Sequence, residues 1–339
     1  MITKKLDTTK ENIKIAAQII KAGGIVAFPT ETVYGLGADA LNEIATSKIY
    51  EAKGRPSDNP MIVHISRIEE LDLIATEISN TAKVLMEAFW PGPITFVLKK
   101  KECVPSVTTG GLNTVAVRMP SDKIARELIK ESQTPIAAPS ANLSGKASPT
   151  NAMDVLEDMD GRVDAVIMGK ECQVGIESTV LDLTSDTPVI LRPGYITKEE
   201  IDKVIKIKTE FDNSLFINPS EKDFHPKSPG MKYKHYAPKA EFKIVKGNGI
   251  GIDKVIKELR DKAENEGKKV EVLYYGEDSE KAAKTFFADL RRLDREDVDL
   301  IISASLKPEG LGFSVMNRMM KSAGYDIICV EEENDDSIS

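Results

Sequence analysis

The chain has 339 residues, 41% hydrophobic and 29% charged, and a formal net charge of −8 at pH 7. This composition is typical of a globular protein of about two domains. The acidic balance argues against broad electrostatic binding to nucleic acid or to anionic membranes, although it leaves room for a local basic cleft. Three dispersed cysteines without a CxxC pair exclude a disulfide framework and a zinc ribbon. The first residues lack an apolar signal segment, and no apolar run is long enough to span a bilayer, so we expect a cytoplasmic protein.

Helical and strand patterns alternate through the first two hundred residues. A helix is predicted at 8–23, where Thr8 and Glu11 fit a capping box and two glycines follow. A buried strand follows at 25–30. The segment PTETVYGLGADA at 29–40, where Gly35 and Gly37 keep the backbone open, either holds a ligand beyond the strand end or is a glycine-containing turn with a helix cap. Further helices are predicted at 42–54, 81–90, 122–132 and 151–159. Further strands are predicted at 61–65, 94–100, 114–119, 135–141, 164–169, 178–184 and 188–194. The alternation indicates an α/β fold, and several hairpin-like strand pairs make its sheet mixed.

The pattern changes after residue 206. Residues 207–239 contain four prolines and little periodicity, which is typical of a connector or a functional lid. A second α/β pattern at 240–331 predicts a smaller, parallel, Rossmann-like domain. A nucleotide site there has weak support, because KGNGIG at 246–251 lacks the GxGxxG spacing. The acidic tail at 332–339 is expected to be disordered.

A rigid basic segment, KGRPSDNP, occupies residues 53–60. It sets Lys53 and Arg55 one residue apart, and Pro56 restricts the backbone between them and the following strand. Such a pair suits phosphate, since arginine binds its oxygens through a fork of donors and lysine adds a point charge. A solvated surface turn is the plainer alternative for this segment alone.

Polar side chains stand at the predicted strand ends. Arg118 ends an apolar strand and needs a partner, which could be a structural ion pair or a substrate carboxylate. His64 could be a core residue or a substrate ligand. The short donors of 138–150 could bind phosphate or ribose, or form a serine-rich turn. The lysines and aromatic residues of 228–238 fit either a lid over a nucleotide or a linker.

Taken in order, these segments resemble the long form of the threonylcarbamoyl-AMP synthase family. Its signature is the KxR of Lys53 and Arg55 with the SxN of Ser140 and Asn142. The resemblance covers nearly the whole chain. The motifs that add to it, in family order, are PTETVYGLGA, RPSDNPMIVHI, WPGPIT, VAVRMP, APSAN and SPGMKYKHYAP.

The resemblance implies a fold and a reaction. The fold is a YrdC-like catalytic domain with a twisted mixed sheet at 1–206, a connector that closes over the site at 207–239, and the Rossmann-like domain at 240–331. The reaction is a nucleotidyl transfer that makes threonylcarbamoyl-AMP and pyrophosphate from L-threonine, bicarbonate or CO2, and ATP. Mg²⁺ would accompany ATP, with no organic cofactor and no metal ligands assigned to protein side chains. The product would pass to the machinery that modifies adenosine 37 of tRNAs reading ANN codons.

The resemblance also implies roles for individual residues. The catalytic set is Lys53, Arg55, Ser140 and Asn142. The expected threonine contacts are Thr32, His64, Arg118, the backbone at Ala138, and Ser178. The expected ATP contacts are Arg55, Asn59, Thr114, Ser140, Ser148, Arg192 and Ser228. The expected lid residues are Tyr233, His235 and Tyr236.

Two alternatives remain at this stage. One is the related carbamoyl-adenylate chemistry of hydrogenase maturation, which the lack of acylphosphatase and cysteine-rich zinc segments disfavours. The other is a non-catalytic RNA-binding module of the same superfamily, which would use a local basic cleft for weak RNA binding.

Overall fold

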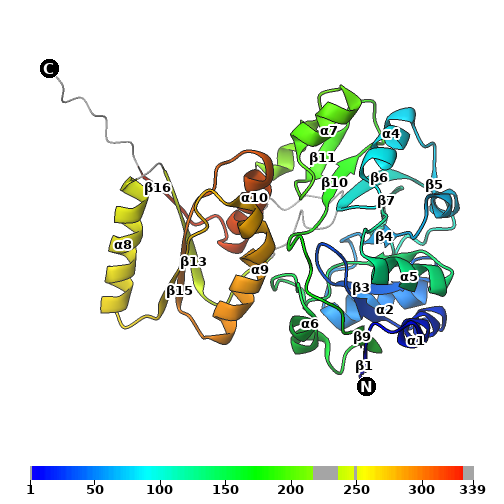
Figure 1. Ribbon diagram of the computed structural model, residues 1–339, viewed down its shortest axis with the longest axis horizontal. Coiled ribbons are helices and arrows are strands. Elements are labelled where there is room, and N and C mark those ends of the chain that lie inside the picture. The colour runs from blue at the N-terminus through cyan, green and yellow to red at the C-terminus, as the bar shows by residue number, and fades with distance from the viewer. Residues whose placement is uncertain (1, 217–235, 248–249, 331–339) are drawn as a thin grey trace.

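A large mixed sheet forms the centre of the first domain (Figure 1). The computed structural model describes residues 2–216, 236–247 and 250–330. The strands of this sheet lie in the order β1 (Lys4–Leu6), β9 (Ala165–Ile167), β2 (Val26–Phe28), β3 (Gly35–Asp39), β8 (Ile136–Ala138), β4 (Ile62–His64), β7 (Thr114–Arg118), β6 (Ile94–Lys100), β10 (Thr179–Asp182), β11 (Val189–Arg192) and β12 (Glu210–Phe211). The short β5 (Ala75–Thr76) pairs with β6 off this path. Parallel pairs such as β4–β7 stand beside antiparallel pairs such as β6–β7, so the prediction of a mixed sheet is confirmed.

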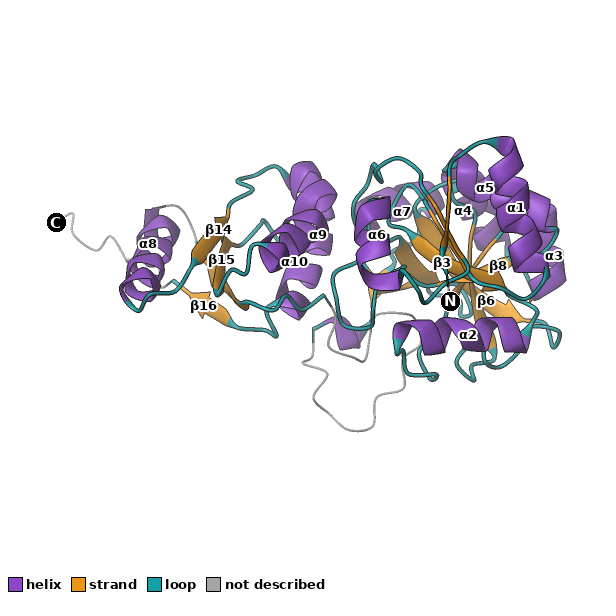
Figure 2. Ribbon diagram, turned by 90° about the horizontal axis from the view of Figure 1, so that it is seen from below, coloured by secondary structure: helices purple, strands orange, loops and turns teal. Residues whose placement is uncertain are grey.

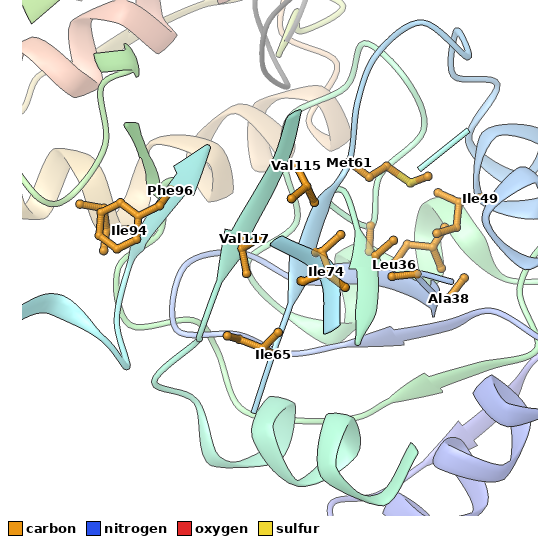
Figure 3. Close-up of a cluster of buried hydrophobic side chains, with 14 of the residues drawn as sticks. Leu36, Ala38, Ile49, Met61, Ile65, Ile74, Ile94, Phe96, Val115 and Val117 are labelled. Carbon is orange, nitrogen blue, oxygen red and sulfur yellow. The ribbon is translucent and has the colours of Figure 1, made fainter. Parts of the chain in front are cut away.

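Helices cover both faces of this sheet. They are α1 (Lys10–Lys21), α2 (Glu43–Lys53), α3 (Leu71–Ile74), α4 (Asn80–Phe89), α5 (Lys123–Ser132), α6 (Ala152–Met159) and α7 (Lys198–Ile205), with short 3-10 turns η1 (Ile68–Glu70) and η2 (Asn213–Leu215). Side chains alternate along each strand, so Val26 and Phe28 pack with α1 and α5 while Ala27 belongs to a larger core on the other face. Figure 3 shows part of that larger core, including Leu36, Ile49 and Val117.

The first helix starts differently from the prediction. Its N-cap is Thr9, and no side chain caps it, so the capping box of Thr8 and Glu11 is wrong. Asp7 explains the difference: its Oδ1 accepts hydrogen bonds from the Thr9 amide (2.9 Å), the Thr9 hydroxyl (2.6 Å) and Asn12 Nδ2 (2.8 Å). The aspartate therefore fixes the turn before the helix from outside it.

The second half of the glycine-containing segment after β2 is a strand, Gly35–Asp39, whereas the residues before it form a loop as expected. Gly35 and Gly37 lie in β3, between β2 and β8. A Cβ at Gly37 would come within 2.6 Å of Ile136 Cγ2 and 2.7 Å of Phe28 Cε1. The glycines thus allow large side chains of the neighbouring strands to cover the sheet at this point.

A four-stranded parallel sheet forms the second domain, as predicted. Its strands lie in the order β14 (Val270–Leu273), β15 (Leu300–Ala304), β13 (Glu241–Lys246) and β16 (Ile327–Cys329). Its helices are α8 (Ile250–Asn265), α9 (Ser279–Arg295) and α10 (Gly310–Ser322). Helix α8 covers the outer face of the sheet, whereas α9 and α10 cover the face toward the first domain (Figure 2).

Within the described residues, no helix has the length and apolar character needed to cross a membrane.

Candidate functional site

The polar strand ends meet at one edge of the large sheet. Parallel strands β4 and β7 end in register at His64 and Arg118. Strand β6 is antiparallel to β7 and parallel to β10, so β10 starts at this edge just after Ser178. Strand β11 returns antiparallel to β10 and ends there at Arg192. A cavity opens to solvent at this edge, and all four residues line it.

Most of the predicted site residues line this cavity. They are Thr32, Lys53, Arg55, His64, Arg118, Ala138, Ser140, Asn142, Ser178, Arg192 and Tyr236. Three predicted residues, Ser228, Tyr233 and His235, lie outside the described residues.

Asn59, Thr114 and Ser148 are not among the lining residues. Asn59 is buried behind Arg55, whose Nε donates to the Asn59 carbonyl oxygen at 3.3 Å. Thr114 is the first residue of β7, at the other end of the strand from Arg118. Ser148 is fully buried, and its hydroxyl donates to Glu177 Oε1 at 2.6 Å. The structure therefore leaves these three residues behind or away from the cavity wall.

Arg118 lines the cavity and contacts two neighbouring side chains. Its Nη1 donates to Thr32 Oγ1 at 2.9 Å, and its Nη2 lies 2.8 Å from Glu31 Oε2. Its buried Nε has no hydrogen-bond partner within the part of the chain that the structure describes. Burial raises the pKa of Glu31, but the charge and hydrogen bond of Arg118 outweigh that effect and leave the pKa below its ordinary value. The structural ion pair is present, and Arg118 still keeps one donor for a ligand.

His64 is neutral in this site. Burial and the nearby positive charge of Arg118 lower the pKa of His64 to about 3. Its Nδ1 lies 3.1 Å from the Ile62 carbonyl oxygen, and Phe28 packs edge-on against the ring. The imidazole can therefore contact a ligand without adding a second cation beside Arg118.

Lys53 anchors the SxN loop. It ends α2, and Gly54 then turns the chain with φ of 60°. Its Nζ donates to the carbonyl oxygens of Ser140 and Asn142, each at 2.5 Å. Burial, followed by the charge of Arg55, lowers the pKa of Lys53 well below its ordinary value. Lys53 therefore shapes the loop as well as lining the cavity.

Asn142 fixes the next turn of that loop and keeps a free acceptor. Its Nδ2 donates to the carbonyl oxygens of Leu143 (2.8 Å) and Lys146 (2.9 Å). Its buried Oδ1 has no hydrogen-bond partner among the residues described. A neutral oxygen in this position can accept a donor or contact a hard cation.

Two arginines add positive charge to the cavity. Arg55 Nη2 donates to the Pro60 carbonyl oxygen at 3.0 Å, and burial lowers the pKa of Arg55 to about 10, so it stays protonated. Arg192 is buried, and its Nε and Nη2 donate to the Ser178 carbonyl oxygen at 3.1 and 2.9 Å. Together with Lys53, they form a basic wall inside an acidic chain.

Helices α9 and α10 of the second domain contact residues that line the cavity. Tyr236 lines the cavity with φ of 62°, and its ring packs on Phe287 of α9 with centroids 4.9 Å apart. Arg318 of α10 has only 1% of its surface exposed and lies with its Nε 3.2 Å from Glu177 Oε2.

Three charged side chains at or beside the cavity were not predicted as site residues: Glu31, Glu177 and Lys146. Glu31 and Glu177 each precede a predicted ligand residue, Thr32 and Ser178, and each is buried. A buried carboxylate next to a strand requires a cation as its partner. This requirement could have identified Glu31 and Glu177 from the sequence. Nothing local in the sequence indicates that the partner of Glu177 lies 141 positions away.

The described residues contain no cluster of three or more His, Cys, Asp or Glu side chains that could hold a metal ion. A cation at this site would therefore depend on ligand oxygens together with isolated protein oxygens such as Asn142 Oδ1.

Two family models together match residues 18–324 except residue 195. The Sua5–YciO–YrdC family model, described as telomere recombination, matches residues 18–194. The model described as threonylcarbamoyl-AMP synthase, C-terminal domain, matches residues 196–324.

Relatives of similar length share both domains. Threonylcarbamoyl-AMP synthase of Pyrococcus abyssi is 50% identical over 94% of this chain and 96% of its own. The Bacillus subtilis protein of that name is 44% identical over 96% and 97%. The crystal structure of P. abyssi Sua5 complexed with L-threonine superposes with a TM-score of 0.93 at 47% identity, over 98% of this chain and 100% of that one. The chain therefore belongs to the threonylcarbamoyl-AMP synthase family and is an enzyme of this type.

Proposed function

We propose that this chain condenses L-threonine, bicarbonate or CO2, and ATP to threonylcarbamoyl-AMP and pyrophosphate. The product then serves N6-threonylcarbamoylation of adenosine 37 in ANN-reading tRNAs, through a separate transferase machinery, which implies a cytoplasmic enzyme. One observation carries the proposal: a single cavity is lined both by Arg118 beside a neutral histidine and by four further basic side chains, Lys53, Arg55, Lys146 and Arg192. The names of the relatives, one of which was solved with L-threonine, support it.

Threonine would lie against Arg118. The free Nε of Arg118 suits the threonine carboxylate, because a charge-assisted bond in a buried site is strong. Neutral His64 does not repel the amine that must react. Thr32, Ser178 and the backbone at Ala138 would complete the contacts, since all three line the cavity.

ATP would occupy the basic wall. We propose that Arg55, Ser140 and Arg192 contact it directly, because they line the cavity. Asn59 and Ser148 would act through the groups they hold, Arg55 and Glu177 respectively. Ser228 remains part of the proposal but lies outside the described residues, as do the lid residues Tyr233 and His235. We also propose that Thr114 contacts ATP; this residue is not among those that line the cavity.

The chemistry needs positioning more than a protein nucleophile. The threonine amine and CO2 give a carbamate, whose oxygen attacks the α-phosphorus of ATP while the bond to the pyrophosphate oxygen breaks. Negative charge builds on the transferring and leaving phosphates, and fixed cations stabilise it. Lys53, Arg55 and Arg192 would supply those charges and hold the phosphates in line.

Mg²⁺ fits this site only as a companion of ATP. When bound, it would neutralise phosphate charge. Two neutral oxygens on the cavity wall would suit it, the Oδ1 of Asn142, which has no hydrogen-bond partner among the described residues, and the hydroxyl of Ser140.

The test is pyrophosphate release that depends on threonine and bicarbonate, measured without tRNA. We expect release from the wild-type chain and a loss of at least about tenfold in Lys53→Ala and in Arg55→Ala. Lys130→Ala, on the exposed surface of α5, is the matched control and should keep full activity. No release from the wild-type chain would favour the alternative of a non-catalytic RNA-binding module. Near-normal release by both active-site variants would show that the KxR assignment is wrong.

A further inference from the structure

The second domain is packed tightly against the elements that carry the basic wall. Val33, Ala147 and Ile176 of the first domain belong to the same buried apolar cluster as Phe287 of α9 and Met316 of α10. The backbones also approach closely, because a Cβ at Gly175 would lie 2.3 Å from the Lys284 carbonyl oxygen. A change in α9 or α10 is therefore transmitted directly to residues beside the cavity.

Arg318 spans this interface. Besides its contact with the Glu177 carboxylate, it donates through Nη1 to the Pro193 carbonyl oxygen and to the Ser314 carbonyl oxygen. Ser314, one turn earlier on α10, donates its hydroxyl to the Gly194 carbonyl oxygen at 2.7 Å. Helix α10 thus holds both Glu177 and the two residues that follow Arg192.

Glu177 is a buried anion on the cavity wall. Only 6% of its surface is exposed, and its two oxygens contact Ser148 and Arg318. Burial raises the pKa of Glu177, but the charges of Arg318 and then Arg192 outweigh burial and keep the carboxylate ionised. One anion therefore interacts with two arginines, and Glu177, Arg192 and Arg318 together carry a net charge of +1. Lys321 of α10 also interacts with these three groups: burial, and then the positive charges of Arg318 and Arg192, lower the pKa of Lys321 to about 7.

The charge count changes if Arg318 is removed. Glu177 and Arg192 then compensate each other, and Arg192 no longer presents net positive charge to an anionic ligand. A phosphate would then face a neutral pair instead of a group with net positive charge, and it would lose that electrostatic stabilisation. We propose that Arg318 of the second domain is a positioning residue for ATP, which neutralises Glu177 so that the charge of Arg192 remains available to the phosphates. This inference rests on the proposed function.

The experiment measures the Kd for ATP by calorimetry on full-length variants, together with the KM values for ATP and for threonine. We expect Arg318→Met to weaken ATP binding about tenfold or more, as expected when one partner of a buried ion pair is removed. The KM for threonine should stay within about twofold, because Arg118 and His64 are untouched. Adding Glu177→Gln to Arg318→Met should restore ATP binding to within about threefold of wild type, since it removes the negative charge that cancels the charge of Arg192.

Arg291→Met is the matched control, because Arg291 is also a buried arginine of the second domain that crosses the interface. Its Nη2 lies 2.7 Å from Asp158 Oδ2 rather than near Glu177. Glu177→Gln should give no rescue in the Arg291→Met background. Three results would overturn the inference. They are rescue by Glu177→Gln in the Arg291→Met background, an equal loss of affinity for ATP and threonine in Arg318→Met, and no improvement of ATP binding in the double variant.

The outcomes separate this inference from the proposed function. Wild-type chain that binds ATP but releases no pyrophosphate would contradict the proposed function, while the Kd values would still decide the role of Arg318. Wild-type chain that does not bind ATP would overturn both. If Arg318→Met does not fold, Arg318→Lys provides the test: it keeps the charge and should bind ATP within about threefold of wild type. A loss of tenfold in a folded Arg318→Lys would show that charge compensation is not the cause.

Discussion

Replacing Arg118 by methionine should destabilise the protein in a pH-dependent way. The guanidinium and the Glu31 carboxylate lie 2.8 Å apart, and only 4% and 8% of their side chains are exposed. Methionine fills similar space but leaves the carboxylate buried, with the Ser121 amide as its donor at 3.1 Å. Breaking one half of a buried ion pair costs about 3–5 kcal/mol. For a protein of this size class, that loss corresponds to a fall in Tm of roughly 6–20 °C.

The sign of the pH effect follows from Glu31. In the wild-type chain the pKa of Glu31 is lowered below its ordinary value of 4.5, so its contribution to stability is present above that value and is lost as the pH falls through the lowered value. In Arg118→Met, the arginine no longer opposes the effect of burial, and burial therefore raises the pKa of Glu31. The variant then carries a penalty above the ordinary pKa that disappears as the pH falls below it and the carboxylate gains a proton.

Calorimetry at pH 7 and pH 4 provides the assay. The difference in Tm between wild type and Arg118→Met should be large at pH 7 and clearly smaller at pH 4. The double variant Glu31→Gln/Arg118→Met is the control, and it should recover most of the stability at pH 7 because no buried charge remains. An equal deficit at both pH values, or a double variant no more stable than the single one, would refute the reasoning.

Two further substitutions test the packing around the cavity. Gly194→Ala would place a Cβ 2.2 Å from the Thr179 amide nitrogen; since backbone cannot yield cheaply, we expect a loss of about 3 kcal/mol or more, seen as a lower urea midpoint. An unchanged midpoint would contradict that packing. Asp158→Asn removes the charge that faces Arg291 (2.7 Å) and Lys146 (2.8 Å), so we expect a loss of about 3 kcal/mol in thermal unfolding. A Tm within 1 °C of wild type would mean that these contacts contribute nothing measurable.

Strand ends could be predicted well from the sequence. The apolar runs that end at His64 and Arg118 fix both the strands and the face on which the polar residue lies, because a half-buried strand has a strict two-residue period. The pairing that brings these two residues into register, however, depends on contacts between segments far apart in the chain.

Strand β3 and helix α7 show why the rest was harder. Glycine has a low strand propensity, so Gly35 and Gly37 indicated a loop, whereas the large neighbours Phe28 and Ile136 require glycine in the strand. Helix α7 was not predicted, although Thr197 and Glu200 form the capping box that opens it. Its apolar positions are few, because only Ile201 is buried, and the 3.6-residue pattern is correspondingly weak.

The buried arginines of the second domain could not be assigned from sequence at all. Arg291 lies in a helix that carries many other charged residues, and Arg318 shares α10 with Lys321, so the local sequence does not show which of these cations is paired. Only the tertiary structure shows that each meets a carboxylate more than 130 positions away.

The arginines that cross between the domains also constrain how this architecture can evolve. Asp154, Asp158 and Glu177 belong to the first domain, but their partners Arg295, Arg291 and Arg318 belong to the second. A descendant that lost the second domain would retain these carboxylates without their arginine partners, and all three side chains are nearly inaccessible to water in the two-domain chain. Such a loss requires earlier or simultaneous neutral replacements in the first domain, and exchange of second domains between lineages requires matched pairs.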